Sequence, residues 1–167
     1  MTAIRLRALI AAPNPTVLAG CYDGVSARLV QQAGFQAAHM SGFAVAGSLL
    51  GKPDVGLLTM TEMADAASRL ARVLSIPLLA DADTGYGNAL NVVRTVEAYI
   101  AAGVAGMHLE DQQMPKRCGH LAGKTVVSPD EMASKLRAAI DTRDDAGIDM
   151  VIIARTDARA EEGLGAA

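Results

Sequence analysis

The sequence is poor in aromatic residues and has no large excess of either charge. Both absences limit the classes of partner that the protein can bind. Aromatic residues make up 3% of the 167 positions, and tryptophan is absent. The 15 lysines and arginines are set against 18 aspartates and glutamates, which gives a net charge of −3. Nucleic-acid binding relies on basic side chains for phosphates and on aromatic rings for bases. We therefore expect no nucleic-acid partner.

Signals for export, membrane insertion and disulfide formation are also lacking. The chain contains no run of roughly 18 apolar residues, the length that crosses a bilayer. The first residues do not form the apolar core and cleavage site of a secretory signal. Cys21 and Cys118 are the two cysteines, and their separation fits no metal-binding motif. We expect a cytoplasmic protein with reduced thiols and no membrane partner.

Five short apolar segments are predicted to be strands, with helices between them. The strands are Thr16–Cys21, Gln36–Met40, Ile76–Ala80, Gly106–Leu109 and Met150–Ile153. The helices are Leu6–Ile10, Val25–Gln32, Thr61–Leu74, Ala89–Ala102 and a last one that begins after Ser128 and ends at Gly147, and residues 43–58 are predicted to be a long loop. Continuous apolar strands separated by helices are typical of a parallel sheet covered on both faces.

Two closures of such a sheet are possible, a doubly wound open sheet and a (β/α)₈ barrel. Polar residues follow the C-terminal ends of all the predicted strands: Cys21, Asp23, Ser41, Asp81, Asp83, Glu110, Arg155 and Asp157. A barrel builds its active site from every strand end, whereas an open sheet binds its ligand at one switch point. We therefore predict an α/β chain of the TIM-barrel type, a single partial domain over residues 1–167. A full barrel needs about 250 residues, so we expect only the first five βα units, without the C-terminal strands and helices.

Three carboxylates are predicted to gather at the ends of two neighbouring strands. Asp81 and Asp83 stand two residues apart after one strand, and Glu110 ends the next. Side chains two residues apart on a strand share a face, and neighbouring strands lie about 5 Å apart. Convergent carboxylates repel one another unless a cation or protons compensate. We interpret them as a Mg²⁺ site, with Mn²⁺ possible, because Mg²⁺ prefers oxygen ligands; alternatively, the two aspartates cap the turn at Gly85–Gly87.

The loop after these carboxylates concentrates reactive side chains. It contains Lys116, Arg117, Cys118, Gly119 and His120 in direct succession. A thiol among cations lies in positive potential, which favours the thiolate or prepares the SH group to donate a proton. The alternative is a solvated basic turn. We interpret the segment as a catalytic loop, because connecting loops rarely hold so many reactive groups.

Other polar residues near strand ends allow more than one interpretation. Arg155 is suited to bidentate binding of a carboxylate, but it could instead form an ion pair with Asp157 or Glu110. Cys21 is interpreted as a small buried hydrophobic residue. The role of His39 stays open, since a histidine before a strand end is more often part of the core than a ligand.

Seven motifs occur together in the order of a known family. They are Tyr22–Arg28, Ser41–Gly42, Gly51–Gly56, Asp81–Gly85, Glu110–Gln112, Lys116–His120 and Ile153–Asp157. With these motifs the chain resembles the isocitrate lyase/phosphoenolpyruvate mutase superfamily over essentially its whole length. The Lys-Arg-Cys-Gly-His loop is similar to that of the carbon–carbon lyases, and phosphonomutases lack its cysteine. Residues 41–45 and 51–59 are most similar to the dimethylmalate lyase and petal death protein type.

The resemblance implies a role for each motif. Asp81 would hold Mg²⁺ directly, and Asp83 and Glu110 would hold it largely through water. The implied substrate-binding residues are Ser41, Gly42, Phe43, Asp54, Arg117, Gly119 and Arg155. The implied catalytic residues are Cys118, Lys116, His120 and Arg155. Cys118 would be the general acid on a loop that closes over the site, and Asp54 would lie on a second mobile loop.

The resemblance also implies a reaction, a Mg²⁺-dependent cleavage of a 2-hydroxy dicarboxylate to a 2-oxo acid and a carboxylate. The substrate would resemble 2,3-dimethylmalate or 2-methylisocitrate. His39 stands where methylisocitrate lyases carry a tyrosine, and Phe43 replaces a glycine, which favours a smaller acid than a tricarboxylate. Family members form homo-oligomers, so a tetramer is expected. The alternatives are an oxaloacetate hydrolase or decarboxylase, a phosphonomutase, or an inactive truncated fragment.

Overall fold

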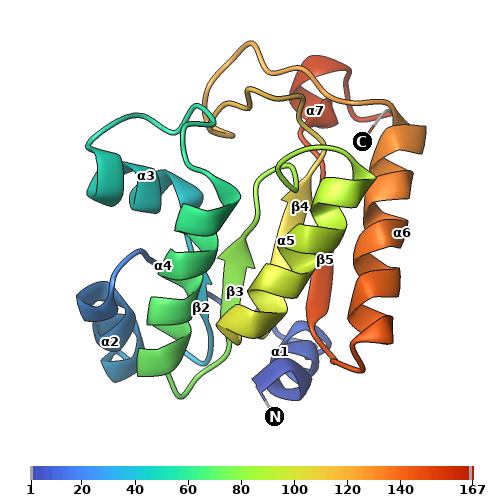
Figure 1. Cartoon of the computed structure of the whole chain (residues 1–167). Helices are drawn as coiled ribbons and strands as arrows, with labels where there is room; N and C mark the ends of the chain where they lie inside the picture. Colours follow the sequence, from blue (N-terminus) through green and yellow to red (C-terminus); the bar gives the residue numbers. More distant parts are fainter. Residues whose placement is uncertain (1, 166) are drawn as a thin grey trace.

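The chain forms a five-stranded parallel sheet with helices in the connections (Figure 1). The computed structural model describes residues 2–165 and 167. The strands lie in sequence order, β1-β2-β3-β4-β5, and every neighbouring pair is parallel. A doubly wound sheet would reverse its strand order at a switch point. The order without reversal is that of a barrel wall, as predicted.

The elements alternate as the sequence predicts, with small shifts at their ends. The strands are β1 (Ala19–Cys21), β2 (Ala38–Met40), β3 (Leu78–Asp81), β4 (Gly106–Glu110) and β5 (Val151–Arg155). The helices are α1 (Thr2–Ile10), α2 (Gly24–Gln32), α3 (Gly42–Leu50), α4 (Met60–Val73), α5 (Ala89–Ala102), α6 (Pro129–Asp145) and α7 (Ala158–Glu161). β1, β2 and β3 begin two or three residues later than predicted, and β5 extends to Arg155.

The predicted loop over residues 43–58 is wrong in its first half, which forms α3. Ser41 caps the helix by accepting a hydrogen bond from the Ala44 N–H, and Gly51 ends it in the left-handed conformation (φ 62°). The glycines in this stretch weaken its helix propensity, which is why the sequence did not predict a helix. Burial of Val45 and Ala46 against the core outweighs that propensity.

The crossover helices form a single layer on one face of the sheet. Helices of neighbouring crossovers contact one another, α2 with α4, α4 with α5, and α5 with α6. Successive right-handed crossovers in a sheet without reversal place every helix on the same side. The expectation of helices on both faces is therefore corrected. Leu6 of α1 packs in a separate small cluster with Ala37, Ala105 and Val151.

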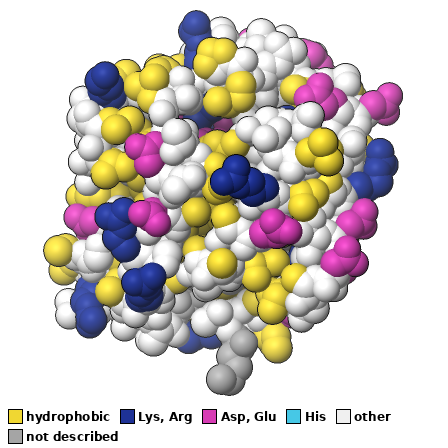
Figure 2. Space-filling model, viewed as in Figure 1, with side chains coloured by type: hydrophobic (Ala, Val, Ile, Leu, Met, Phe, Trp, Pro, Cys, Tyr) yellow, Lys and Arg dark blue, Asp and Glu magenta, His cyan; other side chains and the backbone are white. Residues whose placement is uncertain are grey.

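The surface carries both charges interspersed. Figure 2 shows lysines, arginines and acidic residues mixed over the visible face, with no extended patch of one sign. Within residues 2–165 and 167, no helix is long and apolar enough to cross a membrane. The mixed surface charge agrees with the small net charge of the sequence.

Tyr99 joins the helical layer to the strand end at which acidic residues gather. This tyrosine of α5 is fully buried, and its hydroxyl donates a 2.7 Å hydrogen bond to the main-chain carbonyl oxygen of Asp81. The bond fixes the backbone at the C-terminal end of β3. The helix therefore helps to hold the strand end from which Asp81 projects.

We predict that Tyr99→Phe lowers the free energy of unfolding by about 1–3 kcal/mol, because a buried carbonyl loses its donor. Urea unfolding followed by circular dichroism measures this loss. Tyr22→Phe is the matched control, since Tyr22 is 42% exposed and its variant should unfold like the parent. Equal stability of the Tyr99→Phe variant and the parent would contradict the role of this bond.

Candidate active site

A polar cavity of about 400 Å³ opens at the C-terminal end of the sheet. Its walls come from the strand ends and from the two long loops after α3 and β4. The residues that line it are His39, Ser41, Phe43, Asp54, Asp81, Glu110, Lys116, Cys118, Gly119, His120 and Arg155. Most of the predicted site residues therefore meet in one cavity, as expected for a barrel-type site.

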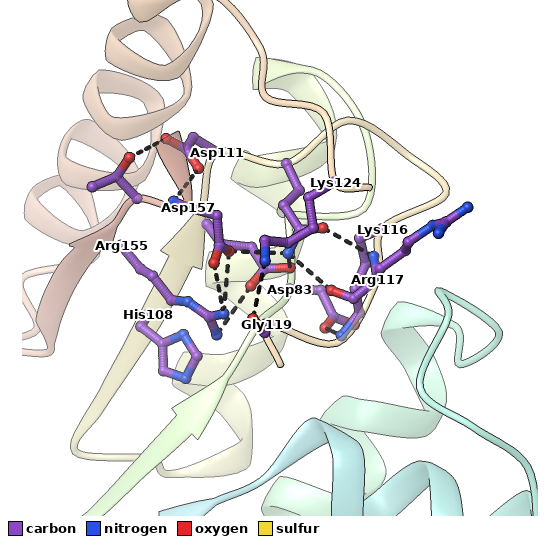
Figure 3. Close-up of polar contacts among 12 residues, drawn as sticks. Asp83, His108, Asp111, Lys116, Arg117, Gly119, Lys124, Arg155 and Asp157 are labelled. Atoms are coloured by element: carbon purple, nitrogen blue, oxygen red, sulfur yellow. Dashed lines mark hydrogen bonds and ion pairs between the residues drawn. The ribbon is translucent and has the colours of Figure 1, made fainter. Parts of the chain in front are cut away.

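Lys116 is the central cation of this cavity, and its side chain is almost completely buried. Its Nζ lies 2.7 Å from Asp54 Oδ1 and 2.6 Å from Asp83 Oδ1 (Figure 3). Burial alone would lower the pKa of Lys116, but the two carboxylates together outweigh burial and raise it. Lys116 therefore stays charged and neutralises part of the acidic cluster.

Two of the predicted metal ligands are poorly stabilised as anions. Burial raises the pKa of Glu110 to about 8, against the opposing charges of Arg155 and Lys116. Burial and the neighbouring Asp81 raise the pKa of Asp83 to about 6. A carboxylate in such surroundings gains stability from any additional cation. The site thus has residual affinity for positive charge.

Arg155 holds the opposite wall of the cavity. Its guanidinium lies 3.1 Å from Glu110 Oε2 and 3.1 Å from Asp157 Oδ2. The in-register pairing of Glu110 with Arg155 on β4 and β5 brings the first two together. Both ion pairs considered from the sequence therefore form. The guanidinium has five N–H donors and is one-third exposed, so it can also bind a carboxylate from the cavity.

Position 42 requires a glycine because its backbone lies very close to the Asp81 side chain. A Cβ at this position would stand 2.6 Å from Asp81 Oδ2, and the Gly42 N–H donates to the same oxygen at 3.1 Å. Gly42 is one of the predicted substrate-binding residues, and its N–H is already bound to a protein carboxylate. Ser41 lines the cavity, and although its Oγ accepts the helix-cap bond, its hydroxyl proton is free to donate.

The loop residues separate into those that face the cavity and those that do not. Cys118, Gly119 and His120 line it, and Phe43 lies 59% exposed at its wall. The Arg117 guanidinium extends away from the cluster in Figure 3 and donates to the carbonyl oxygen of Ala122. Among the predicted substrate-binding side chains, Arg117 is the one directed elsewhere.

Cys21 behaves as the small buried residue that the sequence predicts. It is fully buried, and burial, with a smaller contribution from Asp23, raises its pKa to about 11. Its thiol is therefore kept protonated. The two cysteines are free and play different parts, since Cys118 lines the cavity.

Two histidines form a contact that the sequence does not reveal. His39 Nε2 lies 3.0 Å from His108 Nε2, and the stacked rings have their centres 5.2 Å apart. Burial lowers the pKa of both side chains, so both rings are neutral near pH 7. His39 is thus a cavity-wall residue supported by its neighbour on β4.

The donor chemistry of the site fits a hard divalent cation. Asp81, Asp83 and Glu110 offer carboxylate oxygens, which Mg²⁺ prefers, and two of them have raised pKa values that a cation would lower. In the part of the chain that the structure describes, however, no three acidic, histidine or cysteine side chains are arranged to hold a metal ion. Asp83 is directed to Lys116 instead. It also lies beyond β3, in the left-handed region (φ 47°), so strand alternation does not explain its placement.

Three further polar residues support the site, and the sequence analysis gave none of them a role. Asp111 accepts hydrogen bonds from Thr156 Oγ1 and from the Asp157 N–H, and Lys124 donates to the carbonyl oxygens of Gly119 and Leu121. Asp111, Asp157, Lys124 and Gly119 are labelled in Figure 3. The side chain of Gln112 donates to the main-chain carbonyl oxygen of Arg117 in the loop. All three are buried. The signal available for Asp111 and Gln112 was their place in the Glu110–Gln112 motif, just after the end of β4. Lys124 gave no such signal.

We predict that Lys116→Met lowers the free energy of unfolding by about 3–5 kcal/mol, because Asp54 and Asp83 lose their buried counter-charge. Urea unfolding in the presence of a chelator measures the effect. Lys52→Met is the matched control, since Lys52 is exposed on the same loop as Asp54 and should be neutral. A Lys116→Met chain as stable as the control would show that the ion pairs contribute little.

The sequence is similar to those of known enzymes over almost its whole length. The sequence profile described as phosphoenolpyruvate phosphomutase matches residues 6–166. The chain is 48% identical to 2,3-dimethylmalate lyase of Eubacterium barkeri, over 98% of this chain and 56% of that protein. It is 52% identical to a chloroplastic carboxyvinyl-carboxyphosphonate phosphorylmutase of Arabidopsis thaliana (93% and 46% covered) and 48% identical to 2-methylisocitrate lyase of Escherichia coli (96% and 54%).

Solved structures of similar enzymes also match this chain. Oxaloacetate acetylhydrolase bound to 3,3-difluorooxalacetate matches with a TM-score of 0.94 and 46% identity, over 98% of this chain and 56% of that one. A 2,3-dimethylmalate lyase matches with a TM-score of 0.93 and 42% identity (99% and 56% covered). Phosphonopyruvate hydrolase complexed with oxalate and Mg²⁺ matches with a TM-score of 0.83 and 34% identity (95% and 53%).

The chain spans about half the length of the curated relatives that it matches. The relatives include lyases and mutases, and the fold they share with this chain is the TIM-barrel type of their superfamily. The matches extend over both loops and all five strands that build the cavity. The chain therefore belongs to the phosphoenolpyruvate phosphomutase family, within the isocitrate lyase/phosphoenolpyruvate mutase superfamily.

Proposed function

We propose that the protein is a Mg²⁺-dependent lyase that cleaves a 2-hydroxy dicarboxylate to a 2-oxo acid and a carboxylate. The observation that carries this proposal is a single cavity lined by acids, an arginine and the Cys118 thiol. Acids can hold a cation, an arginine can bind a carboxylate, and a thiol can protonate carbon. The 48% identity to a 2,3-dimethylmalate lyase supports a substrate of that kind.

Asp81, Asp83 and Glu110 would hold Mg²⁺, which supplies a Lewis acid that makes a substrate hydroxyl easier to deprotonate. The structure of a relative complexed with oxalate and Mg²⁺ supports the same pairing of metal and acid. Mn²⁺ could replace Mg²⁺, because it also accepts oxygen ligands.

The remaining chemistry falls to the side chains of the cavity. Arg155 and the Ser41 hydroxyl would orient one substrate carboxylate. The hydroxyl proton would pass to a water molecule before the loop closes. The C2–O bond then becomes a carbonyl, the C2–C3 bond breaks, and its electron pair passes to C3. Cys118 would donate its thiol proton to C3 and complete the carboxylate product. Lys116 would hold the loop closed through its ion pairs with Asp54 and Asp83, and His120 would complete the wall of the cavity. A closed loop excludes water from the carbanion.

A second candidate is the hydrolysis of oxaloacetate. The TM-score of 0.94 with an oxaloacetate acetylhydrolase supports it, because the match covers 98% of this chain. This reaction also breaks a carbon–carbon bond between two carboxylates. The two candidates differ in whether water attacks the substrate. A phosphonate substrate is a third outcome to test, given the 52% identity to a phosphorylmutase.

We expect the chain to release a 2-oxo acid from 2,3-dimethylmalate or 2-methylisocitrate when Mg²⁺ is present. A coupled assay for pyruvate measures this. Oxaloacetate and phosphonopyruvate are the parallel substrates, followed by the release of oxalate and of phosphate. Cys118→Ala should lower turnover by about 100-fold or more, because the proton donor is lost. Cys21→Ala is the matched control. Oxalate release from oxaloacetate alone would favour the second candidate, and no turnover of any of the four would refute both.

We also expect Mg²⁺ to raise the melting temperature of the chain. A free ion concentration 100 times the dissociation constant adds about 2.7 kcal/mol to stability. Differential scanning calorimetry with and without Mg²⁺ measures the shift, which Asp81→Asn should abolish. Asp65→Asn serves as control, since Asp65 is exposed on α4 and paired to Arg69. A shift of equal size in both variants would place the ion elsewhere.

A further inference from the structure

Gln112 has a dense set of contacts for a side chain without charge. It lies two residues after the end of β4 and is 1% exposed. The two hydrogens of its Nε2 are shared among three acceptors, the Arg117 carbonyl oxygen at 2.9 Å, Asp157 Oδ2 at 3.0 Å and Glu110 Oε1 at 3.2 Å. Its Oε1 accepts from the Arg117 N–H at 2.9 Å. One amide therefore meets the backbone of the loop and the acids of two strand ends.

The contacts fix the orientation of this amide. Three acceptors surround Nε2, and the one donor in reach, the Arg117 N–H, faces Oε1. Rotating the amide by 180° would turn each of these contacts into a clash of like groups. A glutamate at position 112 would lose both donors and add a negative charge between Glu110 and Asp157. Only an amide satisfies both sides of this junction.

The bonds to the Arg117 main chain matter because of where Arg117 lies in the loop. Arg117 stands between Lys116 and Cys118, so holding its N–H and carbonyl oxygen fixes the backbone of both neighbours. At the other end of the loop, Lys124 donates to the Gly119 and Leu121 carbonyl oxygens, each at 3.0 Å. The segment that carries the thiol is therefore tied to the strand ends through Gln112, and Lys124 adds bonds within the loop itself.

We propose that Gln112 is the positioning residue that holds the Lys116–His120 loop against the ends of β4 and β5. Its amide joins the loop to Glu110 and Asp157, and both of those carboxylates pair with Arg155. One side chain thus fixes the position of the loop relative to the carboxylate-binding arginine. This inference concerns the placement of the loop and holds for whichever reaction the cavity performs.

Hydrogen exchange of the whole chain, followed by mass spectrometry, tests the proposal. In Gln112→Met, a substitution of similar size without donors, we expect residues 114–124 to exchange about tenfold faster or more, because several buried hydrogen bonds are lost together. Residues 89–102 of α5 should exchange as in the parent. Gln112→Glu should accelerate the loop further. Gln113→Met is the matched control, since Gln113 is exposed and adjacent.

Two results would overturn the proposal. One is equal exchange of residues 114–124 in the Gln112→Met and Gln113→Met chains. The other is a parallel acceleration of the loop and of α5, which would mean that Gln112 supports the whole fold rather than the loop. If the variant does not fold, amide hydrogen exchange of the parent chain, measured by NMR, tests the proposal instead. Its Arg117 amide should then be protected, and exchange as fast as in an open loop would contradict the proposal.

Discussion

Buried negative charge at the C-terminal edge of the sheet is the constraint on which the rest of the site depends. Four carboxylates, those of Asp54, Asp81, Asp83 and Glu110, are all at most 8% exposed. Acids in such surroundings must be neutralised by protons, by basic side chains or by a metal ion. Lys116 and Arg155 supply two positive charges, and the raised pKa values of Glu110 and Asp83 show that these do not compensate fully.

This electrostatic requirement also organises the loops. Lys116 belongs to the loop after β4 and pairs with Asp54 of the loop after α3, and the Cys118 N–H donates to the Asp54 carbonyl oxygen at 3.0 Å. Neutralising the acids therefore brings both loops over the cavity and places the thiol in its wall. Gln112 adds neutral bonds to the same junction. Charge compensation and loop placement are thus two effects of one set of contacts.

Much of the candidate site was predictable because parallel strands end at one edge. The positions of Asp81, Glu110 and Arg155 follow from strand ends that the apolar runs define, and the structure lines one cavity with all three. The partners within the site were not predictable. That Lys116 pairs with Asp54, 62 residues away, depends on the path of two loops, whose glycines and prolines fix no single conformation.

The sequence by itself determined the alternation of strands and helices, the barrel-type order and the family, because apolar periodicity, helix caps and contiguous motifs are local. Only the tertiary structure decided that α3 is a helix, that two neutral histidines meet, and that Gln112 contacts the loop backbone and two acids. Each of these depends on burial between segments far apart in the chain. Local propensity contains no information about such contacts, since their free energy arises only when the segments pack together.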